Sequence, residues 1–272
     1  MLNRLQMYGR LLQQDPVNFL VFMAFMAVAV LISLILHECA HGYMALRCGD
    51  PTAKMLGRLS LNPLRHLDPI GTICMFLLGF GWAKPVPVNP RNFDNYRRDD
   101  FLVSIAGIVT NLTLFMICSL SAVLVNRFIW SPEFMPVLEE MFGGRDTYVN
   151  VFRSGSLAEA LSYSISLDGM QLFTQQYWLL YVQRFLLMMV DVNLTLALFN
   201  FLPIPPLDGF HILNDTILKG RLQLNPEMFR IAQTILIVLL LATDVVDVIL
   251  VKGGELIGGS IIRTFLMLTG QM

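Results

Sequence analysis

Charged residues are scarce in this chain, and their scarcity argues against a soluble globular protein. Only 14% of its 272 residues are Asp, Glu, Lys or Arg and 55% are hydrophobic, whereas charged residues make up about a quarter of a typical soluble domain. The formal net charge is −1, so the chain lacks the basic excess typical of proteins that bind nucleic acid. Its four cysteines show no CxxC or CxxH spacing, which argues against a disulfide framework or a structural zinc knuckle. The composition predicts an integral membrane protein in contact with the lipid bilayer.

Long apolar segments predict an all-α polytopic membrane protein. About 20 helical residues span the ~30 Å of hydrocarbon in a bilayer, and four segments reach that length: 17–46, 101–127, 177–202 and 229–251. Residues 69–82 are too short for a full span and contain glycines, which indicates a short covered helix or a re-entrant segment. Residues 256–268 are either peripheral or a partial helix. We expect a helical bundle of about five or six membrane segments, with a short strand-like or re-entrant region after the first helix.

We expect one membrane-embedded domain over residues 1–272, with a core of 17–127 and 177–251 and an extramembrane insertion at 131–176. Eight basic side chains lie in 47–68 and 83–100, but only two lie in 131–176. Basic connections tend to stay in the cytoplasm, so we place the first two connections inside and 131–176 outside. Arg4 and Arg10 near the N-terminus oppose this assignment.

The first apolar segment ends in the sequence His37-Glu38-Cys39-Ala40-His41. Residues four apart share one face of a helix, so both imidazoles can reach one metal ion while Glu38 stands beside them to transfer a proton. Two imidazoles and a carboxylate within one turn at membrane depth are costly to bury unless a metal ion binds them. The segment predicts a site for one Zn²⁺ per chain.

A catalytic zinc needs a third protein ligand, and Asp208 is the strongest candidate. It follows three prolines in the sequence NFLPIPPLDG and precedes Gly209, so the preceding helix ends here and the backbone can turn beside the carboxylate. Alternatively, Asp208 braces the turn through hydrogen bonds. His66 and His211 are weaker alternatives for the third ligand.

HECAH in a membrane helix, with NFLPIPPLDG in a later segment, resembles the site-2 protease family of intramembrane zinc metalloproteases. Residues 61–71, 81–89 and 106–111 are similar to successive blocks of the compact bacterial branch, which lacks accessory soluble domains. The resemblance implies His37, His41 and Asp208 as zinc ligands and Glu38 as the catalytic base. It also implies a multi-pass protein of the cell membrane, which is the inner membrane if the organism is a bacterium with two membranes.

We therefore expect an intramembrane zinc metalloprotease that hydrolyses peptide bonds within or near transmembrane segments of membrane-protein substrates. Zinc would activate water while Glu38 carries its proton to the leaving amine. Asn111 or Asn200 would stabilise the oxyanion or hold the substrate strand, since an amide does so without adding charge. Ile108 stands where the family block ordinarily has proline, so the resemblance says less about the backbone conformation near Asn111.

Two other functions are compatible with an apolar, histidine-containing membrane chain: zinc binding without catalysis, and di-iron oxygenation. A catalytically inactive zinc-binding membrane protein or a transporter would have no need of Glu38. A di-iron oxygenase would need many more ligands than the four histidines of this chain.

We also expect the strand-like residues 52–61 to hold an extended substrate by edge addition. Arg184 and Asp191 lie in the 177–202 span, where they form an interior ion pair or line a water-filled path to the site; alternatively they are structural, with Arg184 reaching toward the membrane interface.

Overall fold

The structure is a computed structural model, and it describes residues 15–69, 84–130, 145–153, 174–222, 224–242 and 245–271, with the isolated positions 9, 12, 13 and 71. Among these residues, three helices are long and apolar enough to cross a membrane. They are α2 (Pro16–Arg47), α5 (Tyr96–Ile129) and α10 (Leu179–Asn200). The described part is helical, without strands beyond an isolated bridge between Trp130 and Thr174. The prediction of an all-α fold is therefore confirmed for the described residues, whereas the prediction of five or six membrane segments is not confirmed.

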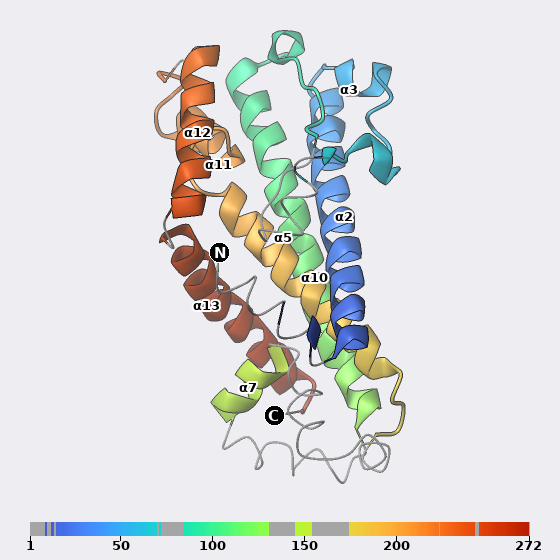
Figure 1. Ribbon diagram of the computed structural model, residues 1–272. Coiled ribbons are helices and arrows are strands. Elements are labelled where there is room, and N and C mark those ends of the chain that lie inside the picture. Colours follow the sequence, from blue (N-terminus) through green and yellow to red (C-terminus); the bar gives the residue numbers. More distant parts are fainter. Residues whose placement is uncertain are drawn as a thin grey trace. The chain divides into compact units, whose positions relative to one another are not determined.

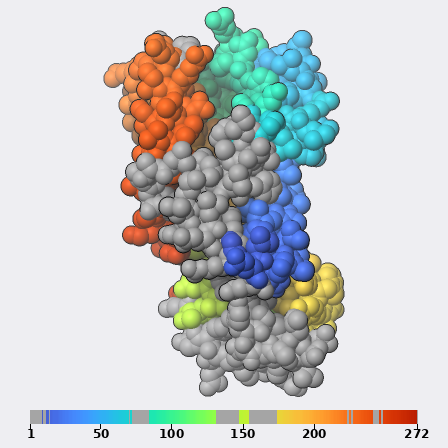
Figure 2. All heavy atoms as spheres, viewed as in Figure 1, coloured from blue at the N-terminus to red at the C-terminus, as the bar shows by residue number. Residues whose placement is uncertain are grey.

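Helix α2 begins at a conventional cap and carries the HECAH sequence near its end. Asp15 accepts a hydrogen bond from the Asn18 backbone N–H at 2.9 Å, and Pro16 occupies the first helical position, where its missing N–H costs nothing. Val17 and Leu20 are 72% and 64% exposed, as expected for side chains that meet lipid, and α2 is seen in blue on the surface in Figure 2. Beyond Arg47 the chain turns at Gly49, whose φ of +94° suits glycine.

The connection after α2 is built around a buried aspartate. It contains α3 (Thr52–Met55), η1 (Pro63–Arg65) and η2 (Pro90–Asn92), and α3 packs against α2 (Figure 1). Asp50 is fully buried and accepts hydrogen bonds from Asn89 N and Asn92 Nδ2, both at 2.7 Å. The prediction of a strand over 52–61 is wrong, because residues 52–55 complete a helical turn and 56–61 form turns and irregular backbone.

The chain divides into two compact units, and both α5 and α10 contribute residues to each. The first unit comprises Met1–Leu112 and Leu196–Leu250, and the second comprises Thr113–Thr195 and Val251–Met272. In the second unit, Asn126 accepts hydrogen bonds from Trp130 Nε1 and Gln183 Nε2 and donates one to Gln271. All of the candidate site residues belong to the first unit.

Two boundaries near the C-terminus differ from expectation. A single span over 229–251 is not confirmed, because the structure describes two helices in this range, α12 (Pro226–Ala242) and α13 (Val245–Leu268), and neither is among the candidate membrane spans of the described residues. Residues 256–268 belong to α13, which continues through Gly258 and Gly259.

Some sequence predictions fall on residues that the structure does not describe. The short helix or re-entrant segment at 69–82 lies almost wholly outside the described residues. Of 131–176, the structure describes α7 (Arg145–Arg153) and residues 174–176. The single-domain assignment and the role of 131–176 therefore remain predictions.

Candidate metal centre

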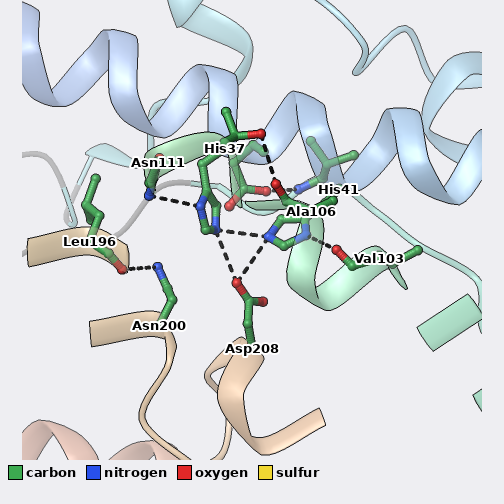
Figure 3. A network of polar contacts seen from close by, with 11 residues as sticks. His37, His41, Val103, Ala106, Asn111, Leu196, Asn200 and Asp208 are labelled. Carbon is green, nitrogen blue, oxygen red and sulfur yellow. Dashed lines mark hydrogen bonds and ion pairs between the residues drawn. The ribbon is translucent and has the colours of Figure 1, made fainter. Parts of the chain in front are cut away.

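Helix α2 brings His37 and His41 together on one face, as the four-residue spacing predicts. Their Nε2 atoms lie 2.9 Å apart, and the two rings meet edge to face with centroids 4.5 Å apart. His37 is only 4% exposed. The two nitrogens that face each other therefore point into one small, largely buried space (Figure 3).

Asp208 completes the cluster from α11 (Asp208–Thr216), a helix that begins at this residue. Its Oδ2 lies 3.4 Å from the Nε2 atoms of both His37 and His41. The chain requires Gly209 next to it, because a Cβ there would collide with the Phe201 carbonyl oxygen. The prolines end α10 and the glycine permits this close approach, so the local sequence sets the direction of the carboxylate.

Helix α5 holds His41 and closes the space beside both rings. The Val103 carbonyl oxygen lies 2.7 Å from His41 Nδ1, so Nδ1 carries a proton and Nε2 keeps its lone pair. A Cβ on Gly107 would lie 2.5 Å from His37 Cε1 and 2.6 Å from His41 Nε2. Gly107 has no predicted role of its own within the block 106–111, although a glycine inside an apolar helix lowers helix stability and invites a packing explanation.

Asn111 contacts His37 on the side away from the cluster. Its Nδ2 lies 3.1 Å from His37 Nδ1, the residue is fully buried, and its Oδ1 has no hydrogen-bond partner. A half-turn of the amide would let Oδ1 accept a hydrogen bond from Nδ1–H. That arrangement is the one that a histidine binding metal through Nε2 requires.

Asn200, the last residue of α10, contacts its own helix. Its Nδ2 donates to the Leu196 carbonyl oxygen at 3.1 Å, and no dashed line joins it to the three clustered residues in Figure 3.

Glu38 is oriented by a backbone donor that sequence reasoning missed. The Val86 N–H donates to Glu38 Oε2 at 2.7 Å. Val86 stands between Pro85 and Pro87, neither of which has an N–H to donate. The alternation of Pro, Val and Pro was the available signal, but only the folded chain shows which acceptor this N–H reaches.

His66 and His211, the alternatives for the third ligand, make contacts outside the cluster of His37, His41 and Asp208. His66 Nε2 is 2.7 Å from the Ser60 carbonyl oxygen, and His211 Nδ1 is 2.9 Å from Asp100 Oδ2. Cys39 Sγ donates to the Ser60 carbonyl oxygen. In the second unit, Asp191 pairs with Arg153 at 3.4 Å, a partner that the sequence does not predict.

The donor set fits a zinc ion. His37, His41 and Asp208 each offer one ligand atom, and these atoms lie within 4.8 Å of one another, the one such cluster among the described residues. Asp208 Oδ2 is buried without a hydrogen-bond partner, a costly state that a cation would relieve. Two imidazoles and one carboxylate, with a fourth position left open, are typical of catalytic zinc sites.

Comparisons with known proteins agree with this chemistry. The model of a family described as "Peptidase family M50" matches residues 24–243. A Bacillus subtilis (strain 168) protein named "Putative zinc metalloprotease YwhC" is 37% identical over 201 residues, which cover 74% of this chain and 73% of the relative. No solved structure gives a significant match. The predicted resemblance and the zinc cofactor are thus confirmed, and the chain belongs to peptidase family M50, the site-2 protease family.

Proposed function

We propose that this protein is an intramembrane zinc endopeptidase that cleaves within or near the transmembrane segments of other membrane proteins. The observation that carries the proposal is the convergence of His37, His41 and Asp208, with Glu38 beside them on a helix able to cross a membrane. The chain's membership of a peptidase family supports the same reaction. Other membrane proteins or peptides are the expected partners, and a multi-pass position in a bacterial inner membrane is the expected location.

In this proposal His37 and His41 bind zinc through Nε2 and Asp208 binds it through a carboxylate oxygen. When bound, zinc supplies Lewis-acid polarisation of the scissile carbonyl and makes a water molecule more acidic. Glu38 accepts the proton of the attacking water and delivers it to the leaving nitrogen. The Val86 N–H engages Oε2, which leaves Oε1 for the proton transfer.

Backbone and amide groups around the centre orient these side chains. Val103 fixes the proton of His41 on Nδ1, and Asn111 is placed to do the same for His37. Asn200 lies at the end of α10, eight residues before Asp208 in the sequence, and we keep it as a candidate donor to the oxyanion or the substrate strand. Asn111 could take that role only by giving up its contact with His37.

The substrate must present an extended backbone at the centre. A transmembrane helix hides its amide groups in internal hydrogen bonds, so the scissile bond becomes accessible only where the helix unwinds. Substrates with glycine, proline or polar residues near the cleavage site should therefore be preferred.

A zinc-binding membrane protein without activity is the second candidate, and one variant distinguishes the two. We would measure zinc content and cleavage of a transmembrane substrate for the wild-type protein, Glu38→Gln and the exposed control Glu227→Gln. The proposal expects zinc in all three proteins and cleavage by all except Glu38→Gln. Zinc without cleavage by any protein would favour the inactive binder, and a wild-type protein that binds no zinc would exclude both candidates.

A further inference from the structure

A second group of titratable side chains lies along α11, beyond Asp208. Asp208, His211 and Asp215 are three and four residues apart, so they follow one face of this helix. The proposed mechanism uses only Asp208. His211 and Asp215 lie against the first turn of α5, where Asp100 is 8% exposed.

Two hydrogen bonds between α11 and α5 are formed in this group. His211 Nδ1 lies 2.9 Å from Asp100 Oδ2, and Arg97 Nη2 donates to the Asp215 carbonyl oxygen at 2.8 Å. The His211 ring also stacks on Phe229 of α12, with centroids 6.2 Å apart and an interplanar angle of 22°. These contacts hold the imidazole in one orientation, toward the Asp100 carboxylate.

Asp215 is the anomalous member of the group. The residue is 4% exposed, and both of its carboxylate oxygens are buried without a hydrogen-bond partner. Arg97 binds the backbone carbonyl of Asp215 rather than its carboxylate. The Asp215 carboxylate interacts with that of Asp100, and two buried carboxylates in such a pair are strongly unfavourable when both are ionised. One shared proton removes the repulsion and supplies the missing donor.

The electrostatic surroundings favour this shared proton. Burial and the neighbouring Asp100 carboxylate raise the pKa of Asp215 to about 7, although His211 and Arg97 act in the opposite direction. Burial disfavours the His211 cation, but its hydrogen bond to Asp100 outweighs burial and raises the pKa of His211. Tyr96 is near enough to both carboxylates to interact with them electrostatically, whereas Phe229 presents an uncharged ring to His211.

We propose that Asp100, His211 and Asp215 form a clasp, held by one shared proton, that joins α11 to α5 and positions Asp208 for the metal. Helix α5 supplies Val103, which holds His41, and Gly107, which packs against both imidazoles. Helix α11 supplies the carboxylate that must meet those imidazoles. A clasp between the two helices therefore sets the separation of the candidate ligands, so the inference rests on the proposed zinc site.

Zinc affinity tests the positioning role. Competition with a chelator would be measured on the full-length protein in detergent micelles at pH 6 and pH 8.5. Asp215→Asn keeps a permanent donor toward Asp100, so it should bind zinc within about twofold of wild type at pH 6 and several-fold more tightly than wild type at pH 8.5. Asp100→Leu should weaken binding about tenfold or more, the usual effect of losing a group that orients a metal ligand.

Asn214→Ala is the matched control on the same helix. It removes two hydrogen bonds to the Leu222 backbone without touching the clasp, so stability should fall while zinc affinity stays unchanged. Equal zinc affinities for Asp100→Leu and Asn214→Ala would overturn the positioning role. If the ratio of the zinc affinities of wild type and Asp215→Asn were the same at both pH values, the proposal of a shared proton would be overturned.

The metal-free protein provides a test that does not depend on zinc. Because the folded state holds the Asp215 proton up to a higher pH than the unfolded state, wild-type stability relative to Asp215→Asn should fall as pH rises from about 4 to 7. A constant difference, or a second bound metal ion in wild type that Asp215→Asn lacks, would overturn the clasp. If the stability difference behaves as expected but wild type binds no zinc, the shared proton stands, and the zinc site and the positioning role both fail.

Discussion

Gly107 is the residue that permits two imidazoles and α5 to lie in contact. We expect Gly107→Ala to reduce zinc affinity by tenfold or more, because its Cβ would come within 2.7 Å of both His37 and His41 ring atoms, and the packed rings have little room to move. Zinc content after purification and chelator competition would measure the loss. Gly259→Ala is the control, since a Cβ there meets nothing within 4 Å. A Gly107→Ala protein that binds zinc normally would show that the rings tolerate displacement.

Val86 acts through its backbone, so its two contributions can be separated. Val86→Pro removes the N–H that Glu38 accepts, whereas Val86→Ala keeps it and shortens a side chain that packs near Gly42. A hydrogen bond to a charged group contributes about 1.5–3 kcal/mol, so kcat for Val86→Pro should fall roughly tenfold to a hundredfold with zinc content retained. Val86→Ala should lose much less. Equal losses in kcat would mean that packing, not the N–H, matters to Glu38.

At the scale of elements, buried Asp50 ties the end of α2 to α3 and to the segment that contains Val86. Burial opposes its ionisation, but hydrogen bonds from Asn89, Thr52 and Asn92 outweigh burial and hold the pKa of Asp50 below its usual range. Asp50→Asn should lower the free energy of unfolding by about 2 kcal/mol at neutral pH, since charge-assisted hydrogen bonds are lost.

The pH dependence of that loss has a defined sign. A depressed folded-state pKa stabilises the protein above the unfolded pKa of about 3.9, and the stabilisation disappears as pH falls through the folded value. The gap between wild type and Asp50→Asn in chemical unfolding should therefore close below about pH 4. Asp94→Asn, at an exposed position, should change stability by less than about 0.5 kcal/mol. A gap that persists at low pH would contradict the role of the Asp50 charge.

Sequence reasoning reached the candidate ligands because their positions depend on local rules. Helical spacing brings His37 and His41 together, and prolines followed by Gly209 place Asp208 at a helix start. The partners of these residues depend on tertiary packing instead. No local rule reveals that Val86 donates to Glu38, and none predicts that residues 52–55 close a helical turn rather than extend as a strand.

At the scale of the whole molecule, the distribution of basic residues predicts which membrane side the zinc centre approaches. The end of α2 that carries HECAH is followed by a connection rich in Lys and Arg, and Lys219 and Arg221 follow α11, which begins at Asp208. Both features favour the cytoplasm. The centre should then lie toward the cytoplasmic face, and substrates should be cleaved in the half of the membrane nearest it.

Cysteine labelling tests this orientation. After replacement of the four native cysteines by alanine, Lys54→Cys and Asn150→Cys each provide one exposed thiol, after α2 and in α7 respectively. A membrane-impermeant maleimide should label Asn150→Cys in intact spheroplasts but Lys54→Cys only after the membrane is opened. Retained cleavage by both variants would establish that their fold is intact. Labelling of Lys54→Cys in intact spheroplasts would reverse the orientation and move the expected cleavage position to the outer half of the membrane, in agreement with the opposing signal from Arg4 and Arg10.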